Sequence, residues 1–215
     1  MQAFERASVL WFPTGGGKTE AYLGLIATSL IFDRIRGKTR GINTWMRFPL
    51  RMLSLQQMER LSKVIAELNI LRGEEKELQQ GDPFSIGYYV GDGVTPNRIS
   101  DKDMSYFSEK EENRKKLLLL RKCPYCESKS YIQTDKAHWR IIHKCSNEEC
   151  FSNTSSSLGS QKGSLPLYIV DNEIYRYLPS VLVGTVDKLA IAGFNASFAN
   201  LIKGVTQQCT EHGFT

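Results

Sequence analysis

A glycine-rich segment near the start of this 215-residue sequence, Pro13 to Thr19, constrains the fold more than any other feature. It reads Pro-Thr-Gly-Gly-Gly-Lys-Thr. An apolar run from Ser8 to Phe12 precedes it, and a helical pattern of apolar residues follows from Lys18 to about Arg36. A strand, a glycine turn and a helix in this order are typical of a phosphate loop, where backbone amides at the helix start surround a polyphosphate. The segment therefore predicts an α/β domain with an ATP site.

Each kind of residue in this loop has a predicted task. The glycines let successive amides point into one concavity, the lysine reaches the β- and γ-phosphates, and the threonine hydroxyl binds Mg²⁺. Lys18 and Thr19 are therefore the predicted catalytic residues. The predicted nucleotide contacts are Thr14, Gly15, Gly16, Gly17, Lys18, Thr19 and Glu20. ATP and Mg²⁺ are the expected cofactors.

Strand and helix patterns alternate through most of the chain. The expected strands are Ile42–Phe48, Phe84–Val90 and Val181–Val183, with the alternation resuming at 165–177 and a short helix at 185–192. Between the first two strands, Ser54 and Gln57 fit a Ser-x-x-Gln capping box, which predicts the start of a helix. Because strand–helix–strand units pair their strands in parallel, the sequence predicts a parallel sheet with helices on both faces.

The alternation breaks between residues 95 and 164, which we interpret as an insertion into the α/β domain. This part contains a charged segment predicted to be helical from Met104 to Lys122, a cysteine-rich stretch, and a linker rich in Ser, Asn and Gly at 152–164. The predicted division is 1–94 as the first part of the ATP-binding domain, 95–164 as the insertion, and 165–215 as the return to that domain, incomplete at its C-terminus.

Four of the five cysteines form two pairs in the insertion, Cys123 with Cys126 and Cys145 with Cys150, separated by 18 residues. In a chain without a secretion signal this spacing predicts metal binding rather than disulfides. Four thiolates complete a tetrahedral zinc site and leave no position for water, so a zinc ribbon at 122–151 is expected to have a structural role. The two nearby histidines are expected to be strand or solvent-facing residues; they are His138 and His143.

The task of the zinc ribbon stays open at the level of sequence. Its basic residues interleave with Tyr131 and Trp139, a combination that suits contact with DNA. Acidic residues such as Glu127 and Asp135 dilute that charge, and a rigid docking surface for a protein partner fits equally well. The basic residues are Lys122, Lys129, Lys136, Arg140 and Lys144.

Three segments resemble motifs of superfamily 2 helicases. The phosphate loop is similar to their motif I in its short form, with Phe12 at the position of the first glycine of the general pattern. The segment from Phe48 to Gln57 resembles motif Ia, and the segment from Val183 to Ala190 resembles a later Gly-Thr motif. All three are similar to those of a group of large bacterial helicase-like proteins that includes the helicase component of DISARM-type anti-phage systems. The resemblance implies a RecA-like first motor domain of an ATP-dependent helicase or translocase.

The resemblance also implies how nucleic acid is held. Residues at the ends of successive strands would grip the backbone of one strand, DNA more readily than RNA, without reading bases. A Pro-Leu-Arg turn that leads into a helix offers amides and a guanidinium to a phosphate, which gives this implication a physical basis. The residues concerned are Arg51, Gln56, Gly91, Gly93 and Thr185.

The resemblance extends to parts outside this sequence. It implies a second RecA-like domain in the full-length protein and a partner protein in a defence complex. It also implies an acidic motif, Asp-Glu-x-His or similar, after the Gly-Thr strand, but no such run follows Ala190. We therefore expect the chain to be the front of a longer enzyme, which by itself binds ATP better than it hydrolyses it.

Composition narrows the classes of protein to which the chain can belong. With 41% hydrophobic residues, 24% charged residues and a net charge of +5, the chain is ordinary for a globular protein, and its charge permits nucleic-acid binding without requiring it. The longest apolar stretch, Ala21 to Phe32, is about half the ~20 residues of a membrane span, and no secretion signal is present. A cytoplasmic protein without a membrane partner is therefore expected.

Two other readings compete with the helicase reading. In the first, the chain is a zinc-ribbon module that binds nucleic acid or a protein, and nucleotide is only a structural ligand. In the second, it is a kinase-like phosphate-loop enzyme, which we disfavour because the motif Ia and Gly-Thr segments would have no task there.

Overall fold

The computed structural model describes residues 8, 9, 11–13, 15–91, 93–193, 196–203, 208, 209, 213 and 214. Its centre is a four-stranded sheet in the order β1-β6-β2-β5, and every pair of neighbours is parallel. The strands are β1 (Thr44–Phe48), β2 (Ile86–Tyr89), β5 (Leu167–Tyr168) and β6 (Val181–Thr185). The parallel α/β fold predicted from the sequence is confirmed.

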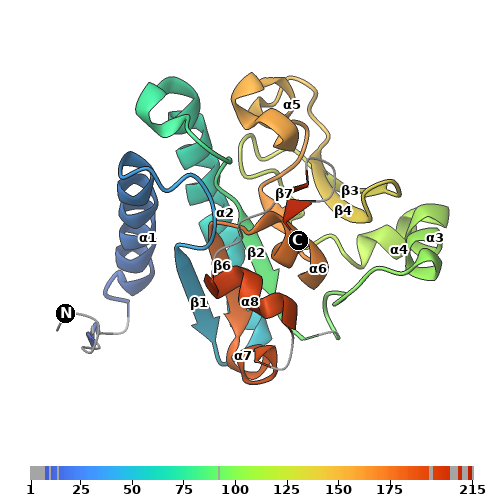
Figure 1. Ribbon diagram of the computed structural model, residues 1–215, viewed down its shortest axis with the longest axis horizontal. Coiled ribbons are helices and arrows are strands. Elements are labelled where there is room, and N and C mark those ends of the chain that lie inside the picture. The colour runs from blue at the N-terminus through green and yellow to red at the C-terminus, as the bar shows by residue number, and fades with distance from the viewer. Residues whose placement is uncertain are drawn as a thin grey trace.

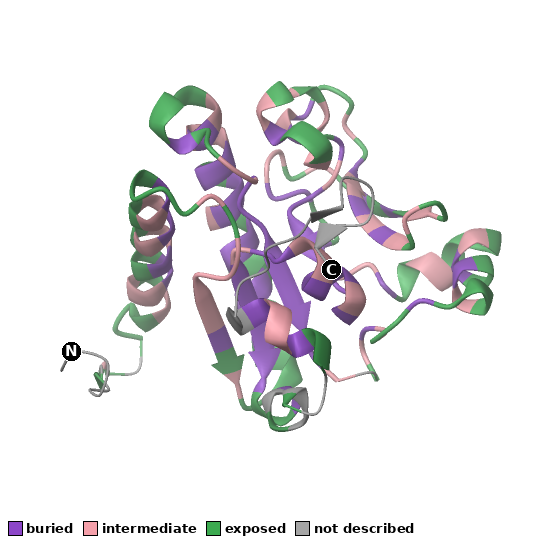
Figure 2. Ribbon diagram, in the orientation of Figure 1, coloured by how far each residue is buried: buried purple, intermediate pink, exposed green. Residues whose placement is uncertain are grey.

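The sheet is covered by helices on both faces (Figure 1). Along β6, Val181 and Val183 enter one hydrophobic cluster and Leu182 enters another, because successive side chains of a strand point to opposite faces. The first cluster lies under α1 (Lys18–Ile35) and α2 (Arg51–Glu74). The second lies under α6 (Asp171–Tyr177) and α8 (Ala199–Lys203). Both faces of the strands are therefore buried, and the centre of the sheet is purple throughout in Figure 2.

Short elements complete this part of the chain. The helix α7 (Val186–Ala192) follows β6 directly, and the remaining pieces are η2 (Lys76–Leu78), η4 (Ala196–Phe198), β7 (Gln208–Cys209) and β8 (Gly213–Phe214). Among the described helices, none is both long and apolar enough to cross a bilayer.

The segment between β2 and β5 forms its own elements but shares the main core. It contains α3 (Asp101–Glu109), α4 (Glu111–Lys115), an antiparallel hairpin of β3 (Ser130–Asp135) and β4 (Arg140–Cys145), α5 (Phe151–Thr154) and η3 (Ser156–Gln161). Side chains from it join the cluster under α2, namely Met104, Phe107, Leu117, Leu120, Ile132 and Ile141. The inserted elements are thus packed into the fold rather than appended to it. The boundaries proposed from the sequence at residues 94 and 164 stay predictions.

The strand expected at Ser8–Phe12 is wrong for the residues that the structure describes there. Positions 8, 9, 11 and 12 have no strand partner, and Val9 and Trp11 are 91% and 84% exposed. A short apolar segment becomes a strand only where a neighbouring edge accepts its hydrogen bonds and a layer covers its side chains. Neither lies beside this segment in the described part of the chain.

Two helix starts and one helix end also differ from expectation. The predicted capping box of Ser54 and Gln57 is wrong, because α2 begins three residues earlier, at Arg51. The Ser54 hydroxyl donates a hydrogen bond to the Arg51 carbonyl, 2.6 Å away. Ser54 is fully buried and also bonds the Tyr88 hydroxyl at 2.9 Å, so it serves packing between α2 and β2.

The long helix expected at Met104–Lys122 is wrong as well. A capping box of Ser100 and Asp103 opens the helix earlier, at Asp101, and the helix ends at Glu109. After the short α4, the leucine run is no longer helical, and Leu117 and Leu120 are buried in the main core. Burial of these leucines against the sheet outweighs their helix propensity.

Candidate nucleotide loop, nucleic-acid edge and metal centre

The glycine loop directly precedes α1 and contains two glycines in the left-handed conformation. Gly15 and Gly17 have φ of 78° and 74°, a left-handed conformation that residues with a Cβ disfavour. The Gly16 amide donates to the Pro13 carbonyl at 3.0 Å, and a Cβ on Gly16 would lie 3.0 Å from that same oxygen. Lys18 and Thr19 are the first two residues of the helix, so their amides have no intrahelical acceptor. Glycine is thus required where the sequence predicted it.

Two other predicted nucleotide contacts are Thr14 and Glu20. Thr14 lies outside the described residues. Glu20 directs its carboxylate to Arg60 on α2 and forms an exposed ion pair with it. The Glu20 pKa lies below its ordinary value because the carboxylate accepts a hydrogen bond from its own amide and a second one from Arg60. In this structure Glu20 therefore links α1 to α2.

The structure brings three of the predicted nucleic-acid residues together. Arg51 is the first residue of α2, directly after β1, while Gly91 and Gly93 follow β2. The Arg51 guanidinium lies over both glycines: a Cβ built on Gly91 would be 2.9 Å from Nη2, and one on Gly93 would be 3.1 Å from Nη1. An exposed cation thus rests on backbone that has no side chains, at the carboxyl end of a parallel sheet. A guanidinium of this kind is the group that forms paired hydrogen bonds with phosphate oxygens in proteins.

The two other predicted nucleic-acid residues are placed differently. Thr185 ends β6 opposite Phe48 on β1, so it lies at the same sheet end, but it is only 3% exposed. Gln56 lies on the exposed side of α2, whereas its neighbour Gln57 is buried and accepts a hydrogen bond from the Tyr22 hydroxyl of α1. The structure therefore gathers Arg51, Gly91 and Gly93, but leaves Thr185 below the surface.

A buried ion pair beside this edge was not predicted from the sequence. Lys188 on α7 lies 2.6 Å from the Asp171 carboxylate at the start of α6, and the two side chains are 3% and 5% exposed. The same ammonium donates to Asn97 Oδ1 at 2.6 Å and lies 4.9 Å from the centre of the Tyr89 ring. The available signal was a lysine inside the Gly-Thr segment and an acidic run directly after an apolar strand.

The four predicted metal ligands converge on one point. Their sulfur atoms lie within 4.8 Å of one another, with 3.6 Å between Cys123 and Cys150 and 3.4 Å between Cys126 and Cys145. A tetrahedral zinc with Zn–S bonds of about 2.3 Å places its sulfurs about 3.8 Å apart, so the cluster fits this ion. Three of the four cysteines are buried, and all four are free thiols. The donor set and its spacing thus match a closed zinc site.

The two histidines near this cluster are engaged elsewhere. His143 is fully buried on β4, its Nε2 accepts a hydrogen bond from the Leu119 amide at 3.2 Å, and burial lowers its pKa to about 3. His138 lies in the hairpin turn, and its Nδ1 is 2.8 Å from the Asp135 carboxylate. Neither replaces a cysteine in the cluster, as the sequence predicted.

The hairpin that ends at Cys145 is held against the sheet by buried groups. Glu173 on α6 is 1% exposed, and its Oε1 accepts a hydrogen bond from the Ile141 amide of β4 at 2.8 Å. Arg140 lies over the Tyr177 ring at 4.7 Å, and its side chain is only 15% exposed. Arg140 thus faces the core, whereas Tyr131 and Trp139 are 45% and 37% exposed. Of the residues considered for DNA contact on the hairpin, Arg140 is therefore not on the outer surface.

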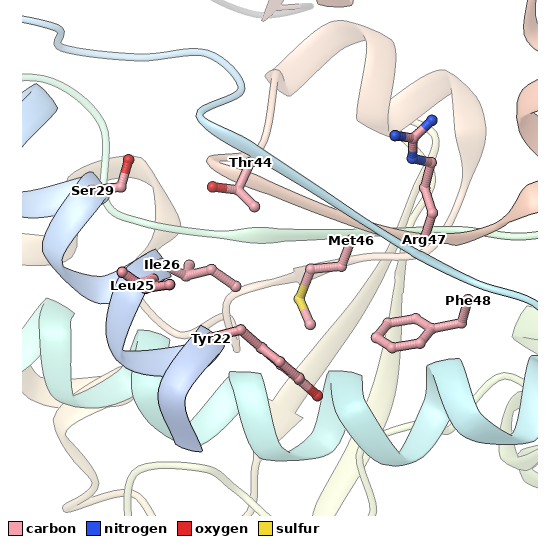
Figure 3. A pocket seen from close by; sticks show the side chains of 8 residues that line it. All are labelled: Tyr22, Leu25, Ile26, Ser29, Thr44, Met46, Arg47 and Phe48. Carbon is pink, nitrogen blue, oxygen red and sulfur yellow. The ribbon is translucent and has the colours of Figure 1, made fainter. Parts of the chain in front are cut away.

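A groove of about 420 Å³ lies along the outer edge of β1 (Figure 3). Four residues at helical spacing on α1 form one wall, and the other wall is β1. The lining residues are Tyr22, Leu25, Ile26, Ser29, Thr44, Met46, Arg47 and Phe48. Because β1 pairs only with β6 among the described strands, the groove follows a free sheet edge, and none of the predicted site residues lines it.

Comparison with known proteins supplies one relative. No family model matches the chain. The chain is 34% identical over 227 aligned positions to DISARM protein DrmA of Bacillus paralicheniformis, and the alignment covers 96% of the chain. The chain is related to a region of DrmA. It spans about a fifth of that protein, since the alignment covers 19% of DrmA. The similarity to a DISARM component, predicted from three short motifs, is thereby confirmed along nearly the whole chain.

Proposed function

We propose that this chain is the ATP- and nucleic-acid-binding first motor domain of an ATP-dependent superfamily 2 helicase or translocase. The relationship to DISARM protein DrmA supports a task in bacterial phage defence. In this proposal the nucleic acid is DNA. In this proposal Lys18 and Thr19 hold Mg-ATP, and Arg51 with Gly91 and Gly93 holds a backbone phosphate. The four-cysteine cluster holds a structural Zn²⁺.

One observation carries the proposal: the left-handed glycine loop and the Arg51 guanidinium over Gly91 and Gly93 lie at the same end of one parallel sheet. The strands of the sheet point toward the end of the molecule at which α1 begins (Figure 1). The left-handed glycines before Lys18 lie at that end, and so does Arg51 over Gly91 and Gly93. In open parallel sheets, ligands bind outside the carboxyl ends of the strands. A motor needs both sites in one domain, because nucleotide-dependent closure must act on the bound strand.

The chemistry of hydrolysis requires more than this chain offers. Phosphoryl transfer needs an acidic group to hold the metal and orient water, and cations to stabilise the transferred charge. After Ala190 the sequence contains a single acidic residue, Glu211. We infer that a further part of the protein supplies the acidic motif and that a second RecA-like domain supplies the cations.

The test is a pair of variants with crossed readouts. Lys18→Ala should weaken Mg-ATP affinity by at least about tenfold and leave the affinity for single-stranded oligothymidine unchanged, because a charge-assisted phosphate contact is lost at one site only. Arg51→Ala should do the reverse and reduce the slope of log affinity against log salt by about one. Lys76→Ala, which removes an exposed lysine remote from both sites, is the matched control. Unchanged Mg-ATP affinity in a folded Lys18→Ala variant would refute the ATP site.

A further inference from the structure

The short helix α6 connects the metal-bearing hairpin to the sheet end at which Arg51 lies. It carries two buried carboxylates only two positions apart, Asp171 and Glu173, with 3% and 1% exposure. They interact with different parts of the molecule. Glu173 contacts the hairpin, and Asp171 contacts α7.

The contact to the hairpin is directional and buried. Glu173 accepts the Ile141 amide at 2.8 Å, and Ile141 is itself 1% exposed. Four positions later, the same strand β4 ends at Cys145, which is one of the four clustered cysteines and pairs with Ser130 across the hairpin. The position of the Ile141 amide therefore depends on a hairpin whose base is the metal cluster.

Further contacts of the first turn of α6 fix the segment after β2. The amides of Asp171 and Asn172 donate to the carbonyls of Pro96 and Asn97, at 3.4 and 3.3 Å. Lys188, which is paired with Asp171, donates to the Asn97 side chain as well. Both the backbone and a buried side chain thus tie residues 96 and 97 to α6.

The segment tied down in this way begins with the glycines under Arg51. Gly91 accepts a hydrogen bond from the Val94 amide at 3.1 Å, so the turn that contains Gly91 and Gly93 leads directly into residues 96 and 97. Lys188, in turn, lies on the helix that directly follows Thr185. A shift of α6 would therefore move the backbone on which the Arg51 guanidinium rests.

We propose that α6 transmits the folded state of the metal-bound hairpin to the turn at Gly91 and Gly93, so that Glu173, Asp171 and Lys188 are positioning residues for nucleic-acid binding. The inference rests on the proposed function for its nucleic-acid part. In this proposal the inserted segment needs no direct contact with nucleic acid. Its bound metal keeps the turn at Gly91 and Gly93 in place. The inward orientation of Arg140 agrees with this assignment.

The first measurement is hydrogen exchange of the zinc-loaded and the chelated chain, which needs no nucleic acid. Removing zinc should speed exchange at the amides of Val94, Asp171 and Asn172 by at least about tenfold, while the ladder between β1 and β6 stays protected. In zinc-loaded Glu173→Leu these amides should already exchange fast, and chelation should add less than about twofold, because the link is broken. Glu173→Gln keeps the acceptor oxygen and should behave like the wild type.

The second measurement repeats this cycle with the affinity for single-stranded oligothymidine. Chelation should weaken binding about tenfold in the wild type and less than about twofold in Glu173→Leu. Lys63→Ala is the matched control, since it removes an exposed ion pair between α2 and Glu127 of the ribbon without touching α6.

The possible outcomes distinguish three claims: the link between metal and turn, the positioning role of α6, and the proposed function. Unchanged exchange at Asp171 and Asn172 after chelation of the wild type overturns the link, even if Glu173→Leu fails to fold. Equal losses of oligothymidine affinity on chelation in wild type and Glu173→Leu overturn the positioning role and indicate direct contact by the ribbon. If the exchange responds as predicted but the wild type does not bind oligothymidine, the proposed function fails, and the link between metal and turn stands.

Discussion

The glycine loop before α1 and the inserted segment with the four-cysteine cluster lie beyond opposite edges of the sheet, and they are anchored in opposite ways (Figures 1 and 2). The loop has the most specific residue pattern in the sequence, yet Gly15 to Lys18 are exposed and the apolar segment before them pairs with no described strand. The insertion has no strand–helix alternation, yet its leucines and isoleucines join the main core, and Glu173 bonds its hairpin from α6.

The difference teaches that the specificity of a motif and its support by the fold are separate properties. A phosphate loop depends on the conformation of its own backbone, so its residues can be recognised in the sequence without knowledge of the surrounding fold. The insertion depends on long-range packing, so its importance is visible only in three dimensions. Disturbing the insertion should therefore affect segments far from the cysteine cluster, such as α6 and the turn at Gly91 and Gly93, and disturbing the loop should affect one ligand.

The strongest test of this contrast is removal of a metal ligand. Cys145→Ser should lower bound zinc from one equivalent per chain to below about a tenth, because three thiolates no longer close the shell, and it should unfold the hairpin. Metal analysis by mass spectrometry together with a thermal melt measures both effects. Cys209→Ser changes the cysteine outside the predicted ligand set and is the control. Full zinc occupancy in Cys145→Ser would break the comparison, because the insertion would not depend on the cluster.

A smaller effect is expected from the buried ion pair of Lys188 and Asp171. Lys188→Met leaves the Asp171 carboxylate buried without its cation, which should cost about 3–5 kcal/mol of unfolding free energy. By contrast, Lys115→Met removes an exposed partner of Glu111 and should cost less than about 1 kcal/mol. Urea unfolding of both variants measures the two values. Equal, small costs would show that the α6–α7 contact does not stabilise the fold.

The smallest effect concerns the pH dependence of the contact between α6 and the hairpin. Burial raises the pKa of Glu173 to about 7, opposed by Arg140, the Ile141 amide and Arg176 and assisted by Asp135. Between pH 4.5, its ordinary pKa, and about 7, the folded carboxyl binds more proton than the unfolded one. This contribution to stability is therefore fully present below pH 4.5 and is lost as the pH rises through 7.

Glu173→Gln does not titrate at this position, so it isolates the contribution. The stability of the wild type minus that of Glu173→Gln should fall by about 2 kcal/mol from pH 5 to pH 8. Taking the difference between the two proteins removes the shared pH dependence of the metal ligands. A difference that stays constant with pH would mean that the carboxylate is not desolvated by the hairpin.

Local patterns predicted the sheet and much of the candidate site. The apolar run at Val181–Val183 is a strand of the parallel sheet, and because both faces of such a sheet are covered, all three consecutive apolar side chains are buried. Arg51, Gly91 and Gly93 could be grouped in advance because each follows a parallel strand, and the carboxyl ends of such strands share one edge.

Contacts between residues far apart in the sequence explain the features that local patterns did not predict. Ser54 matched a capping pattern, but Tyr88 from a distant strand holds it inside the core. The leucines at 117 and 120 looked helical until the sheet buried them, and the Ile141–Glu173 bond joins residues 32 positions apart. Such contacts depend on the assembled topology, for which no short spacing in the sequence is a signal.

The central claim, that the loop at the start of α1 binds nucleotide, is tested most directly by a calorimetric titration of Mg-ATP into the folded wild-type chain. We expect one saturable site per chain, dependent on Mg²⁺ and competed by ADP. A folded, zinc-loaded chain that shows no saturable heat with Mg-ATP would contradict it.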